Sequence, residues 1–274
     1  MNTIPEMFDL TDRAAVVTGG SGLLGKQFCL TLAEAGAAVV VVDINEEGAQ
    51  AVANEITAAG GKAFAAPTNI ADPKSVNAMM DKTLTEFGRL DVLVNSAALD
   101  PKFDPDSIGE QGANAFETFP LEGWQQALDV NLTGMFLCSQ AAVKPMLEQR
   151  KGSIINLCST YGLGGPDQRL YQRKGQPPMY KPVTYTVTKS GVIGMTKYLA
   201  TYYGTRNIRV NTLTPGGVYN NHDPEFTAAY SYRTAMGRMA EQHEMNGALL
   251  FLASDASSYM TGNNLIVDGG WTAW

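Results

Sequence analysis

Cysteine and histidine are scarce in this sequence: its 274 residues include three Cys and two His. Cys29, Cys138 and Cys158 are odd in number and widely spaced, so we expect neither a disulfide framework nor a metal cluster. His222 and His243 have no Cys, His or carboxylate at a matching spacing, so no catalytic metal is expected. The sequence therefore predicts a protein of a reducing compartment, with the cytoplasm as its location.

Long apolar runs and an excess of positive charge are also missing. No stretch reaches about 18 consecutive apolar residues, and residues 1–13 include three carboxylates, so we expect neither a transmembrane helix nor a secretory signal. Lys and Arg number 20 against 27 Asp and Glu, a net charge of −7. This balance argues against nucleic acid or an anionic membrane as a partner.

Apolar residues make up 45% of the chain, which is enough for a sizeable core. Short runs rich in Val, Ile and Leu alternate with longer patterns typical of helices. The predicted strands are 14–18, 39–43, 62–66, 92–95, 153–157, 208–213 and 265–267. The predicted helices are 24–35, 46–59, 73–87, 132–149, 184–203 and 241–254. This alternation predicts the α/β class: a doubly wound, Rossmann-type parallel sheet in a single domain spanning residues 1–274.

Three segments interrupt the alternation: residues 100–119, 162–182 and 216–235. They are too long for ordinary connections and contain Pro, Gly and aromatic residues. Each follows a predicted strand, so we expect all three to gather at the carboxyl edge of the sheet, where ligands bind in such folds. The sequence thus predicts extended substrate loops.

A glycine-rich turn, T-G-G-S-G-L-L-G at residues 18–25, lies between the first strand and the first helix. Glycines let the backbone approach a pyrophosphate, and the helix N-terminus supplies free N–H groups. Asp43 ends the next strand, 18 residues beyond Gly25. Its carboxylate can accept hydrogen bonds from an adenosine ribose and would repel a 2′-phosphate, which favours NAD over NADP. A structural turn with a solvated Asp43 is the alternative.

Tyr185 and Lys189 have the i, i+4 spacing that places both on one face of a predicted helix. A neighbouring ammonium favours the phenolate and brings proton transfer by Tyr185 into range. Ser159 follows a predicted strand and could bond a substrate oxygen, and the amide of Asn131 could hold a water near Lys189. Each residue alone is more often structural: a surface Tyr–Lys pair, a strand-end turn, a helix cap or core amide.

In combination and order, these residues resemble the short-chain dehydrogenase/reductase family over almost the full chain. Supporting pieces are N-S-A-A at 95–98, I-R-V-N at 208–211, T-P-G at 214–216, T-G at 261–262 and D-G-G at 268–270. The resemblance implies that Tyr185 is the general acid/base, that Lys189 lowers its pKa and holds the nicotinamide ribose, that Ser159 orients the reacting oxygen and that Asn131 completes the proton relay. It also implies a homotetramer. The cofactor contacts that it implies are Gly19, Ser21, Gly22, Leu24, Gly25, Asp43, Asn69, Ile70, Asn95, Ala97, Tyr185, Lys189, Pro215, Gly216 and Val218.

Some positions depart from the usual pattern of the family. The turn reads T-G-x-x-G-x-x-G rather than T-G-x-x-x-G-x-G, and N-S-A-A replaces N-N-A-G. Asn69 stands where an Asp usually meets the adenine amino group, and Asn220 stands where a Thr often meets the nicotinamide amide. These changes weaken individual expected contacts and leave the catalytic four in place.

The segment before Tyr185 is basic, with two Arg and two Lys against Asp167 in residues 162–184, although the whole chain is acidic. Because Arg binds carboxylate and phosphate well, we expect a polar, anionic small-molecule substrate. The alternative is a solvated loop whose charges pair with Asp or Glu. The candidate substrate contacts are Tyr161, Arg169, Arg173, Tyr180 and Asn220.

The sequence therefore predicts an NAD-dependent oxidoreductase that interconverts a secondary alcohol and a ketone on a sugar or sugar acid, deoxy-sugar acids included. One alternative is a reductase that acts on a keto group in the synthesis of surface-glycan sugars or of 3-oxoacyl chains. The other, from a different class, is a non-catalytic NAD-binding protein.

Overall fold

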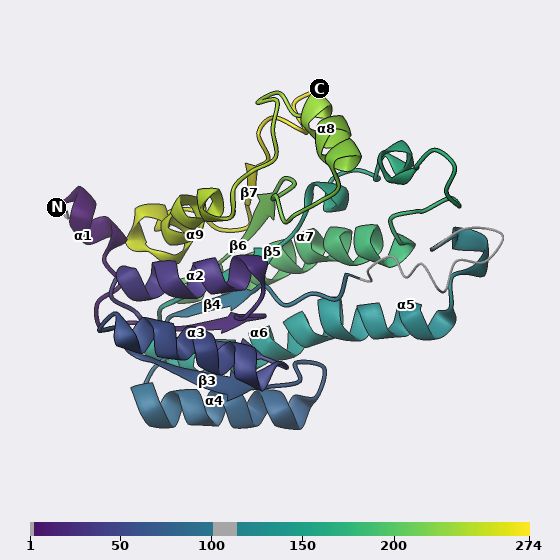
Figure 1. Ribbon diagram of the computed structural model, residues 1–274. Helices are drawn as coiled ribbons and strands as arrows, with labels where there is room; N and C mark the ends of the chain where they lie inside the picture. The colour runs from purple at the N-terminus through teal and green to yellow at the C-terminus, as the bar shows by residue number, and fades with distance from the viewer. Residues whose placement is uncertain (1–2, 101–113) are drawn as a thin grey trace.

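A computed structural model describes residues 3–100 and 114–274, which form a seven-stranded parallel sheet covered by helices (Figure 1). The strands are β1 (Ala14–Thr18), β2 (Ala38–Asp43), β3 (Ala63–Pro67), β4 (Val92–Asn95), β5 (Gly152–Leu157), β6 (Ile208–Pro215) and β7 (Asn264–Val267). Their order is β3-β2-β1-β4-β5-β6-β7. The predicted fold class is confirmed, and each predicted strand is present with bounds that differ by two residues at most.

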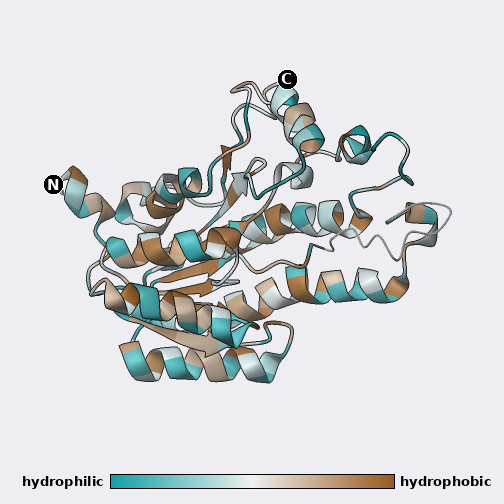
Figure 2. Ribbon diagram, in the orientation of Figure 1, coloured by the Kyte–Doolittle hydropathy of each residue, from teal (hydrophilic) through white to brown (hydrophobic). Residues whose placement is uncertain are grey.

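Helices cover both faces of this sheet. They are α1 (Ile4–Phe8), α2 (Leu23–Glu34), α3 (Glu46–Ala58), α4 (Pro73–Phe87), α5 (Leu121–Leu128), α6 (Met135–Gln149), α7 (Val183–Tyr203), α8 (Pro224–Arg233) and α9 (Asn246–Ala253). Side chains that alternate along the strands pack against α2, α3 and α9 on one face and against α4, α6 and α7 on the other. In Figure 2 the strands are mostly hydrophobic and the outer faces of the helices hydrophilic. Within the described residues, no helix combines the length and apolarity needed to cross a membrane.

The strand order reverses between β1 and β4, so the chain leaves these neighbouring strands in opposite directions. Their carboxyl ends stay close together: the Oγ1 of Thr18 accepts hydrogen bonds from the backbone N–H groups of Ser96 (3.1 Å) and Ala97 (3.2 Å). Gly19 has a positive φ of 65°, and a Cβ at this position would come within 2.8 Å of the Cα of Ala97. Such a reversal opens a crevice at the carboxyl edge of the sheet.

One of the long segments predicted as loops contains a helix. Residues 216–235 include α8, whose N-terminus is capped by Asp223: its Oδ1 accepts a hydrogen bond from the N–H of Phe226 at 2.8 Å. The apolar residues of α8 pack against the substrate loops rather than the sheet. Their spacing therefore does not follow the pattern of a helix that covers a sheet, and α8 was not predicted. Residues 162–182 are irregular except for 3₁₀ turns. Of residues 100–119, the part 101–113 lies outside the described residues.

The helix predicted over 132–149 begins earlier than expected. It starts with α5 at Leu121 and continues into α6 through a π-helical turn at Asp129–Gly134. A π turn inserts an extra residue into the helical ladder. The apolar positions before the turn are therefore out of phase with those after it, which breaks the 3.6-residue pattern used for prediction.

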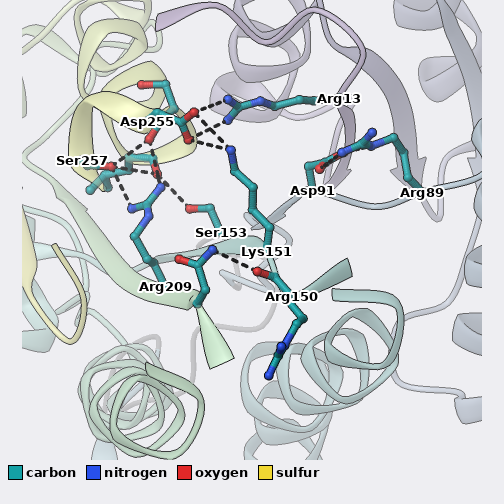
Figure 3. Close-up of polar contacts among 12 residues, drawn as sticks. Arg13, Arg89, Asp91, Arg150, Lys151, Ser153, Arg209, Asp255 and Ser257 are labelled. Atoms are coloured by element: carbon teal, nitrogen blue, oxygen red, sulfur yellow. Dashed lines mark hydrogen bonds and ion pairs between the residues drawn. The ribbon is translucent and has the colours of Figure 1, made fainter. Parts of the chain in front are cut away.

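A charged cluster ties the amino edge of the sheet together, opposite the crevice. Asp255, which follows α9, accepts hydrogen bonds from Arg13 (2.6 Å) ahead of β1 and from Lys151 (3.1 Å) ahead of β5 (Figure 3). Arg209 lies beside this pair and donates to the carbonyls of Leu252 and Ser254. Burial by itself would raise the pKa of Asp255, but the bonds from Arg13 and Lys151 outweigh it and hold that pKa below its usual value.

We expect Asp255→Asn to lower the free energy of unfolding by about 1–2 kcal/mol at pH 7, because it leaves Arg13 and Lys151 facing Arg209 without the carboxylate. Since the pKa of Asp255 is lowered in the folded state, its contribution is present above the unfolded pKa and is lost as the pH falls through the folded one. Urea unfolding of wild type and variant, measured from pH 7 down to about pH 3, below the ordinary pKa of an aspartate, checks this.

Glu55→Gln is the control, because Glu55 pairs with Lys26 on an exposed surface and should contribute less than about 0.5 kcal/mol. A difference between wild type and Asp255→Asn that stays constant as the pH falls would contradict the role given to the Asp255 carboxylate.

Candidate active site

A cavity of about 830 Å³ lies at the carboxyl edge of the sheet. It extends from the glycine-rich turn after β1 to the start of α7, and residues from all three long segments line it. Asp100 comes from the first segment, Lys181 from the second and Asn220 from the third. The described parts of the three segments therefore meet where the sequence predicted, at the edge that binds ligands in such folds.

At one end of the cavity, the backbone forms a cradle that only glycine permits. Gly22 caps α2 without a side-chain hydrogen bond, which leaves the first N–H groups of the helix free. A Cβ at Gly25 would overlap the carbonyl oxygen of Gly19, so the helix and the turn approach each other more closely than an alanine allows. Free N–H groups at a helix N-terminus bind phosphate, so this end of the cavity fits a dinucleotide.

Asp43 lies beside this cradle at the end of β2. Its Oδ2 accepts hydrogen bonds from the N–H (3.0 Å) and the hydroxyl (2.7 Å) of Ser21, and its Oδ1 accepts from the N–H of Asn45 at 3.0 Å. Asn69 and Ile70 line the same end, and the Oδ1 of Asn69 accepts a hydrogen bond from the N–H of Ala71 at 3.1 Å. Among the described residues that line this end, none is Arg or Lys, so Asp43 sets the local charge.

Ser159, Tyr185 and Lys189 meet at the other end of the cavity. Ser159 follows β5 and lies near enough to Tyr185, in the first turn of α7, for its hydroxyl to lower the pKa of the phenol. One turn further along α7, the Nζ of Lys189 donates a hydrogen bond to the carbonyl of Leu157 at 2.9 Å and lies 5.9 Å from the centre of the Tyr185 ring. The edge of β5 and the first turns of α7 thus place a hydroxyl, a phenol and an ammonium together.

The surroundings of Tyr185 and Lys189 shift the pKa values of both groups. Desolvation of the hydroxyl raises the pKa of Tyr185 well above its ordinary value, the negative charge of Asp100 raises it further, and the nearby hydroxyl of Ser159 lowers it. Burial also lowers the pKa of Lys189. Burial and the carboxylate of Asp100 thus favour the protonated form of the phenol.

Asn131 and Asn95 are predicted site residues whose side chains face the interior. The Nδ2 of Asn131 donates to the carbonyl of Leu99 (3.0 Å) and to the hydroxyl of Thr188 (3.1 Å), and its Oδ1 accepts from the N–H of Leu99 at 2.6 Å. This amide ties the loop after β4 to α7. The Nδ2 of Asn95 bonds Ser139 and Asn156 under the sheet edge, so its side chain lies outside the cavity.

Comparison with known proteins decides the family. A family model described as enoyl-(acyl carrier protein) reductase matches residues 21–272. The chain belongs to the short-chain dehydrogenase/reductase family.

Named relatives of this dehydrogenase/reductase act on different substrates. This chain is 36% identical over 268 residues to a 3-oxoacyl-(acyl-carrier-protein) reductase of Synechocystis sp., and the alignment covers 96% of this chain and 98% of the relative. It is 34% identical over 270 residues to a D-threitol dehydrogenase of Mycolicibacterium smegmatis, covering 97% and 95%. The crystal structure of a gluconate 5-dehydrogenase from Burkholderia cenocepacia, in complex with NADP and tartrate, is 30% identical with a TM-score of 0.86 and covers 99% of this chain and 100% of that one.

The two arginines predicted to bind substrate in this dehydrogenase/reductase are paired elsewhere. Arg169 has 87% of its side chain exposed and pairs with Asp167 at 2.7 Å. Arg173 pairs with Asp223 at 2.7 Å and so fastens the basic segment to α8. Neither arginine lines the cavity, and neither does Tyr180, so the structure does not bring these three predicted contacts to the substrate end. Carboxylates of the same chain neutralise the arginines, which the sequence analysis allowed for as its alternative.

Tyr161 and Asn220 do line the cavity, together with residues that the sequence analysis did not select. The additional substrate-end residues are Asp100, Tyr171, Lys181, His222, Phe226 and Tyr230. The Nζ of Lys181 lies 4.0 Å from the centre of the Tyr185 ring. Lys181 could have been predicted as a cavity residue from the sequence, because it lies in the basic segment next to the start of α7.

We expect Gly25→Ala to weaken NADH binding about 100-fold, because the added Cβ pushes α2 away from the turn and its N–H groups no longer converge. Titration of NADH fluorescence with each protein measures this. Gly247→Ala is the matched control, since it also adds a Cβ to a helix but meets no atom within 4 Å. Unchanged affinity in Gly25→Ala would contradict the position of the pyrophosphate, provided that circular dichroism shows both variants folded.

Proposed function

We propose that this protein is an NAD-dependent dehydrogenase that interconverts a secondary alcohol and a ketone on a sugar or sugar acid. The carrying observation is that Ser159, Tyr185 and Lys189 meet in one cavity with the glycine cradle and Asp43. Membership of the short-chain dehydrogenase/reductase family supports an oxidoreductase activity. Cofactor and substrate are the proposed parts.

Bound NAD would supply the hydride acceptor and a positively charged ring at the catalytic end. The hydroxyls of Ser159 and Tyr185, which line the same end of the cavity, would hold the oxygen of the substrate alcohol. Tyr185 takes the hydroxyl proton as the carbon loses hydride, so the alcohol becomes a ketone by loss of two electrons and two hydrogens. The ammonium of Lys189 stabilises the phenolate and can bond a ribose hydroxyl.

Asp43 supports NAD rather than NADP. Its carboxylate is fixed by Ser21 and Asn45, and no described cation lines that end of the cavity to bind an additional phosphate. The gluconate 5-dehydrogenase of Burkholderia cenocepacia was crystallised with NADP, so similarity alone leaves the cofactor open. The proposal therefore depends on the charge of this chain at Asp43.

Polar groups at the substrate end support a sugar or sugar acid. Lys181, Asn220 and His222 line it beside the hydroxyl-bearing rings of Tyr161 and Tyr171. The threitol and gluconate dehydrogenases act on polyhydroxy compounds by name. The Synechocystis relative supports a second candidate, a 3-oxoacyl reductase, which should prefer acyl substrates to polyols and sugar acids.

We expect wild-type protein, assayed with polyols, sugar acids and 3-oxoacyl substrates and with NAD(H) and NADP(H), to reduce NAD fastest with a polyol or sugar acid. Tyr185→Phe should lower kcat about 10²- to 10⁴-fold, because it removes the proton acceptor, and should leave NADH affinity near that of wild type. Absorbance of the reduced cofactor measures turnover. Activity confined to 3-oxoacyl substrates would refute the sugar proposal, and a fully active Tyr185→Phe would refute the role of Tyr185.

We expect Asp43→Asn to raise the NADP-to-NAD ratio of kcat/KM about tenfold or more, because the amide keeps a bond from Ser21 but removes the charge that repels a 2′-phosphate. Asp81→Asn, an exposed change of the same kind on α4, should leave the ratio unchanged. A wild-type enzyme that already prefers NADP would show this interpretation of Asp43 to be wrong.

A further inference from the structure

Of the cations in the basic segment, Lys181 differs from the others in position. Arg169 and Lys174 are exposed, and Arg173 is held by Asp223 and by the carbonyls of Leu170 and Gln172. Lys181 alone among these four lines the cavity, and only 14% of its side chain is exposed. Of the four cations in the basic segment, Lys181 is therefore the one whose positive charge a substrate in the cavity can meet.

The backbone on both sides of Lys181 is fixed. The Oε1 of Gln168 accepts a hydrogen bond from the N–H of Lys181 at 2.8 Å, and the Nε2 of Gln168 donates to the carbonyl of Lys181 at 3.1 Å. Pro182 and α7 follow immediately. The side chain then extends over the face of the Tyr185 ring, where its Nζ is 4.0 Å from the ring centre, a cation–π contact. The ammonium is thus held next to the catalytic residue.

The partner of Lys181 is a carboxylate from the segment after β4, which also lines the cavity. The Nζ of Lys181 donates to both oxygens of Asp100, at 2.8 and 2.6 Å. Asp100 follows β4, its side chain is 44% exposed, and among the described residues this is the one hydrogen-bonded partner of its carboxylate. The carboxylate side of this ion pair is therefore partly open to solvent, so an incoming anion can compete with Asp100 for Lys181.

We propose that Lys181 forms an anion-binding subsite for a carboxylate of the substrate, and that Asp100 is the exchangeable counter-ion that this carboxylate replaces. A carboxylate is the group favoured because Lys181 already binds one through both oxygens. The cation lies over the Tyr185 ring, so the carboxylate would stand close to the reacting carbon. This inference rests on the proposed function, since it identifies the residue that distinguishes a sugar acid from a neutral sugar or polyol.

The test compares gluconate with glucitol, which has the same carbon chain without the carboxylate, and uses the ratio of their kcat/KM values. The ratio cancels any effect of a substitution on Tyr185 that both substrates share. Lys181→Met should lower the gluconate-to-glucitol ratio about 10- to 100-fold, and Asp100→Asn should raise it about two- to fivefold by removing the competing carboxylate. Arg169→Met, which removes an equal charge from the same segment outside the cavity, should leave it unchanged.

A ratio that does not fall in Lys181→Met, or that does not rise in Asp100→Asn, would overturn the proposal. In particular, parallel losses of kcat/KM for both substrates in these two variants would show that the Lys181–Asp100 ion pair only stabilises the two loops that it connects. The Arg169→Met control would also count against it if that variant lowered the ratio as much as Lys181→Met does.

A binding measurement separates failure of the subsite from failure of the proposed function. If wild type oxidises neither substrate, the proposed function fails, and tartrate is titrated calorimetrically into the protein saturated with NADH. Tartrate binding that is about 10- to 100-fold weaker in Lys181→Met and tighter in Asp100→Asn would support the subsite. No binding to wild type, or equal binding to all variants, would overturn it.

Discussion

Reversal of the strand order at β1 and β4 is the constraint on which the rest of this structure depends. In a parallel sheet every strand ends at the same edge, and the reversal keeps that edge open between the two central strands. The close approach of Gly19 to Ala97 keeps those strands tightly paired there. The dinucleotide cradle, Asp43 and the Ser159–Tyr185 pair consequently face one cavity although they are far apart in the sequence.

Charge is distributed differently at the two edges of the sheet. At the amino edge, Asp255 pairs with cations ahead of two strands, Arg13 before β1 and Lys151 before β5, in a structural cluster away from the cavity. At the carboxyl edge, Asp167 and Asp223 neutralise the arginines of the basic segment and fasten it to α8. This pairing leaves Lys181 as the cation of that segment that faces the substrate end. The net charge of a segment is therefore a poor guide to the charge that a ligand meets.

The fold and the dinucleotide end could be predicted because their signals are local. Seven apolar runs gave the strands, and a glycine turn between a strand and a helix gave the cradle, since backbone conformation there depends on a few consecutive residues. The helix through Asp129–Gly134 was predicted too short because a π turn changes the period of the pattern. Arg173 was assigned to the site from the charge of its segment, and Asn95 and Asn131 from the family resemblance, but the partners of these three residues come from distant parts of the chain.

The sequence by itself determined the class of fold, the cradle for a dinucleotide and the i, i+4 pairing of Tyr185 with Lys189, because each is set by neighbours along the chain. Only the tertiary structure decided which polar groups face the cavity and how readily they ionise. Desolvation and the charge of Asp100 raise the pKa of Tyr185, and both effects come from folding residues of separate segments around it. Electrostatic interactions act through space, so their balance is fixed only when the chain has folded.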